Sequence, residues 1–228
     1  MTILLQDIYQ VKGRSELPFE EALRERLQTA DAPGTLVLAA WLPHGGGEGY
    51  EFCVLTELAD GAELDAYHRW GTAPDGTEWT ARLQDMCYTQ SSSLHELRHG
   101  TLATVRAESE ALGLSDIGRL PLYRLDRLST PNPAEALAIV GSQFPVGPPA
   151  TAEPVLVPVA CWSPLLSVLD TPEISVLYRF GEGGFRRASE QDIAARLWDG
   201  EIDLDKVAAA RDTRILRSAR AVFAPTVP

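Results

Sequence analysis

Three things are scarce in this 228-residue sequence: long apolar runs, cysteine and basic charge. No stretch approaches the roughly 18 uninterrupted apolar residues that a membrane helix needs. The start, MTILLQDIYQ, lacks a basic segment followed by a cleavable apolar run. We therefore expect a cytoplasmic protein without a membrane partner.

The three cysteines, Cys53, Cys87 and Cys161, form no C-x-x-C pair and fall inside expected helices and strands. This indicates buried reduced thiols, with no disulfide and no zinc knuckle. The 20 basic residues face 32 acidic ones, which gives a net charge of −12. Such a charge repels nucleic acid and anionic lipid, so the sequence predicts neither as a partner.

What the sequence does contain is an internal repeat. Residues 9–23 overlay residues 123–137 without a gap, sharing a tyrosine, a serine and a terminal Glu-Ala-Leu. Two further sets of matches follow in order: Ala39, Trp41 and Pro43 with Ala160, Trp162 and Pro164, then Glu51, Val54, Leu55 and Gly61 with Glu173, Val176, Leu177 and Gly183. Ordered matches at a nearly constant separation indicate a duplicated unit of about half the chain.

Hydrophobic periodicity predicts the same order of elements in each half. In the first half these are a strand at 3–11, a helix after Ser15, strands at 35–42 and 50–58, helical segments at 64–86, and a strand within 91–105. In the second half they are a strand at 120–128, a helix at 133–140, strands at 155–162 and 174–180, helical segments at 189–210, and a strand at 213–223. The order β-α-β-β-α-β is the ferredoxin-like arrangement, with both helices on one face of a four-stranded sheet.

The other face of such a sheet would be bare, so we expect the two units to press these faces together. The predicted fold class is α+β. Two tandem ferredoxin-like units, residues 1–110 and 111–228, would pack sheet to sheet as one intrachain eight-stranded barrel around a cavity.

This arrangement resembles the dimeric α+β barrel superfamily, and within it the NIPSNAP branch. The residues that carry the resemblance are Tyr9 on an early strand, Glu78-Trp79 before the last strand of the first half, and Ser91 and Ser93 leading into Leu94. The second half lacks the Glu-Trp pair. The resemblance implies a small-molecule cavity, because the superfamily includes cofactor-independent monooxygenases of aromatic polyketide-like substrates, haem proteins such as chlorite dismutases, and small isomerases and decarboxylases.

The segment His95-Glu96-Leu97-Arg98-His99 matches H-E-x-x-H, the zinc-protease pattern. That chemistry needs a helix, in which imidazoles four residues apart share one face. The local sequence favours a strand, in which four residues span about 13 Å, too far for one zinc ion. We expect no metal here, and a metal-dependent hydrolase stays an alternative for a helical segment only.

On a strand, His95 and His99 share a face, and alternation does not decide which face it is. Pointing inward, they are general acid/base candidates, because imidazole titrates near neutrality. Pointing outward, they are ordinary polar residues at a rim. Polar residues that differ between the two halves are the better functional candidates, so Asp7 joins the histidines as a catalytic candidate and Arg124 is a substrate-binding one.

Aromatic residues on the predicted strands are further substrate-binding candidates: Tyr9, Trp41, Tyr50, Tyr123, Trp162 and Tyr178. A cavity lined by aromatics with a few polar groups is the usual small-molecule site. The alternative is that repeated aromatics fill the core.

No cofactor is predicted. The glycine-rich residues 45–49 join two strands and open no helix, so they lack the dipole that phosphate loops use. A haem could take His95 or His99 as an axial ligand, but nothing else in the sequence supports one.

The main hypothesis is an enzyme of specialised small-molecule metabolism. It would bind an apolar or aromatic substrate in the barrel and carry out cofactor-independent oxygenation or cyclisation. The alternatives are a non-catalytic NIPSNAP-like binding or scaffold protein and the metal-dependent hydrolase. Association of two chains into a homodimer stays open.

Overall fold

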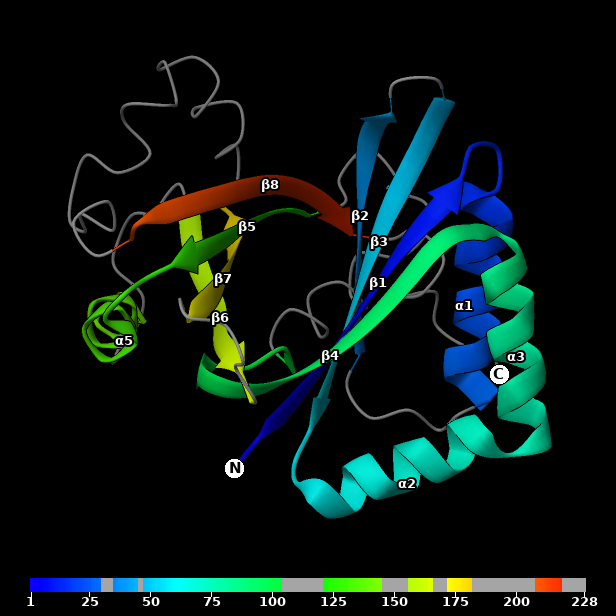
Figure 1. Ribbon diagram of the computed structural model, residues 1–228, viewed down its shortest axis with the longest axis horizontal. Coiled ribbons are helices and arrows are strands. Elements are labelled where there is room, and N and C mark those ends of the chain that lie inside the picture. The colour runs from blue at the N-terminus through cyan, green and yellow to red at the C-terminus, as the bar shows by residue number, and fades with distance from the viewer. Residues whose placement is uncertain are drawn as a thin grey trace. The chain divides into compact units, whose positions relative to one another are not determined.

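The computed structural model describes residues 1–29, 35–44, 47–103, 121–144, 156–165, 172–181 and 208–218, with 27–29, 39–44 and 47–49 described by their backbone alone (Figure 1). The elements are β1 (Ile3–Lys12), α1 (Glu16–Thr29), β2 (Thr35–His44), β3 (Gly47–Leu58), α2 (Gly61–Thr72), α3 (Pro74–Asp85), β4 (Cys87–Gly100), β5 (Leu122–Ser129), α5 (Pro133–Gly141), β6 (Leu156–Pro164), β7 (Glu173–Phe180) and β8 (Ala210–Ser218). The α+β class is therefore confirmed. No helix within the described ranges is long and apolar enough to cross a membrane.

The described residues divide into two compact units. Unit 1 holds residues 1–95, 102–103 and 217–218, and unit 2 holds Glu96–Thr101 and the residues from Pro121 to Leu216. The order of hydrogen-bonded strands is β4-β1-β3-β2 in unit 1 and β8-β5-β7-β6 in unit 2. In each unit, the strand that comes first in the sequence therefore lies between the unit's fourth strand and its third strand. The tandem ferredoxin-like arrangement stays a prediction, as does the boundary at residue 110, which lies outside the described residues.

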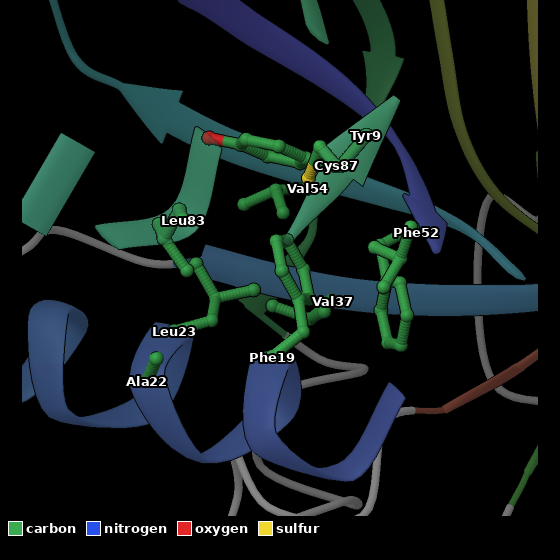
Figure 2. Packing of buried hydrophobic residues seen from close by; sticks show 10 residues of the cluster. Tyr9, Phe19, Ala22, Leu23, Val37, Phe52, Val54, Leu83 and Cys87 are labelled. Atoms are coloured by element: carbon green, nitrogen blue, oxygen red, sulfur yellow. The ribbon is translucent and has the colours of Figure 1, made fainter. Parts of the chain in front are cut away.

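The core of unit 1 lies between its sheet and α1. Phe19, Ala22 and Leu23 are three and four residues apart, so they share one face of α1. Figure 2 shows these side chains directed from the helix toward the strands, where they pack against a cluster that includes Val37 and Val54. The remaining buried members of the cluster are Tyr9, Val11, Phe52, Leu83 and Cys87.

The opposite face of this sheet is buried as well. Side chains alternate across a strand, so Leu36 points away from the helix-facing side that Val37 occupies. Leu36, Leu4 and Leu55 are all fully buried. The sheet of unit 1 thus has two apolar faces, one of which carries helices.

Helices α2 and α3 meet at a sharp corner. The Asp60 side chain caps α2 by accepting the backbone N–H of Ala62 at 2.8 Å and of Glu63 at 3.1 Å. Pro74 opens α3, a position that suits its fixed φ. A Cβ on Gly76 would lie 2.2 Å from the Trp70 carbonyl oxygen, so only glycine allows this close approach. Figure 1 shows α3 beside α1, with α2 running across their end.

Unit 2 has a separate core between α5 and its sheet. The Asn132 side chain caps α5, which begins with Pro133. The buried members of this core are Leu128, Ala136, Val140, Cys161, Ile174, Val176 and Tyr178. The helices predicted at 189–210 fall mostly outside the described residues, and Ala210 already begins β8.

Replacement of Phe19 tests the core of unit 1. Phe19→Ala should lower the free energy of unfolding by about 3–5 kcal/mol, because it leaves a cavity in a fully buried cluster. Leu17→Ala on the same helix is the matched control. Leu17 is 50% exposed, so its replacement should change stability by about 0.5 kcal/mol or less. Equal losses in chemical denaturation would contradict this core.

Candidate functional site

Polar and aromatic side chains gather around Asp7 on the helix-facing side of the sheet in unit 1. We call them the Asp7 cluster: Asp7 and Tyr9 of β1, Arg26 of α1, Tyr67 and Trp70 of α2, and Gln90 and Ser92 of β4. Tyr9 also belongs to the apolar core there. Asp7, two residues earlier on β1, points to the same side by strand alternation.

The Asp7 carboxyl is buried and accepts one hydrogen bond. Its side chain is 5% exposed, and the Ser92 hydroxyl donates to Oδ1 at 2.5 Å. Burial raises the pKa of Asp7 above its usual 3.8, and this effect outweighs the lowering by Ser92 and by the charge of Arg26. Asp7 can therefore take up or release a proton closer to neutrality than an ordinary aspartate.

Arg26 brings a positive charge into the same region. Its side chain is 8% exposed, and its Nη1 donates to the Tyr9 hydroxyl at 3.1 Å. Gln90 Nε2 donates to the same hydroxyl at 3.4 Å. Burial, followed by the charge of Asp7, raises the pKa of Tyr9, so this phenol keeps its proton and can donate it.

Two aromatic rings of α2 border the cation. The Arg26 guanidinium lies 5.4 Å from the centre of the Trp70 ring, in cation–π geometry. The rings of Tyr67 and Trp70 are 6.0 Å apart. Burial raises the pKa of Tyr67, whose hydroxyl also hydrogen-bonds Thr56. Both rings are half-buried, so this part of α2 offers an aromatic surface beside a positive charge.

Together these groups can move a proton and stabilise a negative charge. Asp7 supplies a carboxyl with a raised pKa, Arg26 a fixed cation, and Tyr9 a phenolic donor. Such a set suits proton abstraction with stabilisation of the resulting oxyanion. Within the part of the chain that the structure describes, no group of three His, Cys, Asp or Glu residues could hold a metal ion.

The two histidines of the H-E-x-x-H segment have different surroundings. The segment lies in strand β4, as the sequence favours, so the helical zinc geometry does not form and the metal-hydrolase alternative is wrong in this respect. His95 is 8% exposed, and its Nε2 lies 2.8 Å from the Ser93 hydroxyl. Since Ser92 faces Asp7, Ser93 and His95 point to the opposite side of β4. Asp7 and His95 therefore do not form one site.

His99 belongs to unit 2. Its ring stacks on Phe144 with centroids 5.6 Å apart. A Cβ on Gly141 would lie 2.8 Å from the imidazole, so the end of α5 lies directly against it. These contacts are those of a packed side chain.

The remaining sequence-predicted residues lie in both units. Tyr50 is partly buried against the core of unit 1, and Trp41 lies opposite it on β2, with only its backbone described. In unit 2, Tyr178 belongs to the core and donates to Gln143 at 2.9 Å. Tyr123 and Trp162 are fully buried on the face away from that core.

The strand register corrects the overlay of the two halves. Tyr9 lies opposite Phe52, whereas Tyr123 lies opposite Arg179, and the two tyrosines point to different faces. The matched valines give the true correspondence, since Asp7 lies opposite Val54 and Asp126 opposite Val176. Asp7 therefore has a counterpart in the second half, which the sequence overlay missed.

Sequence reasoning also missed Arg26, Gln90 and Ser92. Arg26 lies in the charged helix segment RERLQ, where nothing in the sequence distinguishes it from its charged neighbours. Ser92 is the middle one of three consecutive serines. Only the alternation of side chains along β4 shows that this serine faces Asp7. The sequence did contain one signal: Gln90 and Ser92 are two residues apart, so both side chains lie on the same face of strand β4.

The raised pKa of Asp7 makes stability depend on pH. The folded protein holds this proton more tightly than the unfolded chain does, so the contribution is favourable at low pH and is lost as pH rises through the folded pKa. Asp7→Asn should therefore raise the free energy of unfolding at pH 7. The advantage should shrink on acidification toward pH 4.

Asp65→Asn on the exposed side of α2 is the control, and it should show no such trend. The measurement is urea denaturation at several pH values. An advantage of Asp7→Asn that grows on acidification would contradict this prediction, because it would show that the folded protein lowers the pKa of Asp7.

Comparison with known proteins shows the fold. No family model matches the chain, and no curated protein matches it. Several solved structures match almost its whole length, among them the following three. A "putative monooxygenase" from Fusobacterium nucleatum has a TM-score of 0.57 at 10% identity, covering 96% of this chain and 92% of its own. A protein of the same name from Lactobacillus acidophilus has a TM-score of 0.58 at 8% identity, covering 96% and 95%.

The third is an anthrone oxidase-like protein, with a TM-score of 0.54 at 10% identity, covering 99% of this chain and 97% of its own. These structures have dimeric α+β barrel folds. At such low identity the likeness concerns the fold alone. The chain thus has the fold of the dimeric α+β barrel proteins.

Proposed function

We propose that the chain is a monooxygenase-type enzyme that oxidises an apolar aromatic small molecule at the Asp7 cluster without a tightly held cofactor. The observation that carries the proposal is the buried Asp7 carboxyl with its raised pKa, beside the cation of Arg26 and the phenol of Tyr9. The names of the fold neighbours, "putative monooxygenase" for two and "anthrone oxidase-like protein" for the third, support this class of reaction.

The chemistry begins with a proton transfer. Asp7 takes a proton from an acidic C–H group that is conjugated with an aromatic carbonyl of the substrate. The electron pair left behind delocalises onto the carbonyl oxygen, and Arg26 and Tyr9 stabilise this oxyanion. A substrate of this kind needs only a base and oxyanion donors before it reacts with dioxygen.

Dioxygen is the oxidant and the only co-reactant. A CH₂ group of the substrate loses two hydrogens and gains one oxygen atom as a new C=O. The second oxygen atom leaves as water with those two hydrogens, one of which passes through Asp7. The balance is CH₂ + O₂ → C=O + H₂O, so no external reductant is required.

Helix α2 is suited to admit the substrate. Tyr67 and Trp70 offer planar rings to an aromatic molecule, and such contacts add binding beyond the area they bury. In the structure α2 has no buried residue. Elements that contribute little to the core open at low free energy, so a ligand can enter under α2 while Phe19, Ala22 and Leu23 of α1 stay packed in the core.

Anthrone with dioxygen is the test substrate, because one fold neighbour is named anthrone oxidase-like. Formation of the quinone is followed by absorbance, and oxygen uptake is measured in parallel. Asp7→Asn should lower kcat/KM by about 10²–10⁴-fold, the usual contribution of a general base. Activity of the wild type should fall on acidification, since Asp7 must be ionised to accept a proton.

His95→Gln is the matched comparison. It removes the titratable group on the opposite side of β4, so turnover should change by less than about threefold if the reaction occurs at Asp7. Loss of turnover in His95→Gln with full activity in Asp7→Asn would move the site to the Ser93–His95 pair. Binding of anthrone without any turnover would instead support the non-catalytic, NIPSNAP-like alternative.

A further inference from the structure

Unit 2 contains a second buried carboxyl at the position that corresponds to Asp7. Asp126 of β5 lies opposite Val176, as Asp7 of β1 lies opposite Val54. The flanking residue Leu128 belongs to the core beneath α5, so Asp126 points to the helix-facing side of its own sheet. Both carboxyls thus occupy the same place in their respective units.

The hydrogen-bond donor of each carboxyl also corresponds. Ser92 of β4 donates to Asp7 Oδ1 at 2.5 Å, and Thr213 of β8 donates to Asp126 Oδ1 at 2.7 Å. In each case a hydroxyl of the last strand of the unit reaches the carboxyl of the first. A carboxyl–hydroxyl pair repeated in this way is a feature of the duplicated unit.

The two carboxyls differ in their second oxygen. Arg211 Nη2 lies 2.9 Å from Asp126 Oδ2, and Arg124 Nε lies 2.9 Å from Oδ1. Asp7 Oδ2 accepts no hydrogen bond from any residue that the structure describes. Leu5 stands two residues before Asp7, where unit 2 has Arg124, and the Arg26 guanidinium is turned toward Tyr9.

We propose that Arg211 fills, in unit 2, the position that a donor group of the ligand takes on Asp7 Oδ2 in unit 1. The chain then has one open site, at Asp7, and one site closed by its own arginines. This inference rests on the proposed function for the location of the site, but not for the oxidation.

The neighbours of Asp7 define the class of ligand. A cationic donor is disfavoured because Arg26 already supplies a positive charge. A neutral O–H group remains, and Tyr67 and Trp70 suit a planar ring. The ligand that binds at Asp7 is therefore an aromatic molecule with a phenolic or enolic hydroxyl that donates to Oδ2.

Calorimetric titration with 1-naphthol, without dioxygen, tests this. The wild type should bind one molecule per chain. Asp7→Asn should weaken binding at least tenfold, whereas Asp126→Asn should keep one site with affinity within twofold of the wild type. 1-Methoxynaphthalene, which has the same rings but no O–H donor, should bind the wild type at least tenfold more weakly than 1-naphthol.

Arg211→Ala provides the opposite test, because it uncovers Asp126 Oδ2. This variant should bind a second molecule of 1-naphthol, and Asp126→Asn in the same background should abolish that second site. A stoichiometry of one in a folded Arg211→Ala variant would overturn the correspondence between Arg211 and the ligand. Should Arg211→Ala fail to fold, the titrations of Asp7→Asn and Asp126→Asn still decide.

Two molecules per wild-type chain, or equal binding of the methyl ether, would likewise overturn the inference. Its failure is distinguishable from failure of the proposed function. Binding of 1-naphthol at one site without turnover of anthrone would leave this inference standing alone. Turnover of anthrone together with two binding sites per chain would support the proposed function and overturn this inference.

Discussion

A carboxyl group lies between a β-sheet and the helices that cover it, and the properties of the candidate site depend on this placement. Taking a charged carboxylate out of water is unfavourable unless hydrogen bonds or opposite charges compensate. Unit 2 compensates Asp126 with two guanidinium groups and a hydroxyl. Unit 1 gives Asp7 one hydroxyl and a cation that hydrogen-bonds a neighbouring phenol. Burial raises the pKa of both carboxyls above the usual 3.8, so the two differ in their hydrogen-bond partners and not in the direction of this shift.

The alternation of side chains along β4 separates two kinds of chemistry. Ser92 faces the helices and Asp7, while Ser93 and His95 face the other way. Neighbouring residues of one strand therefore serve different faces of the sheet of unit 1. A mechanism that combines Asp7 and His95 in one proton relay is incompatible with this geometry, although both residues are buried and titratable.

The order of the elements was largely predictable, because amphipathic periodicity is a local property. Helix α1 and strands β1 to β3 lie within a few residues of their predicted places, and Asp7 was predicted as a candidate. The correct alignment of the two halves was not predictable, because a match of identical residues takes no account of which residues lie opposite each other on neighbouring strands. Strand β6 shifts register between Pro158 and Ala160, and Leu38, opposite Cys53, therefore corresponds to Trp162, opposite Ser175. Arg26 and Gln90 meet at Tyr9 only through tertiary packing.

The three consecutive serines of β4 have a consequence for how the strand finds its place. If β4 slid by one residue along β1, Ser91 or Ser93 would take the position of Ser92, and the carboxyl would still receive a hydroxyl donor. The serines therefore cannot select the correct alignment. That selection must come from the strand's beginning, where the Lys12 amide donates to the Met86 carbonyl at 2.9 Å and Cys87 enters the apolar core. A misaligned β4 would keep a hydroxyl contact with Asp7 but lose the hydrogen bond from Gln90 to Tyr9 and the packing of Cys87.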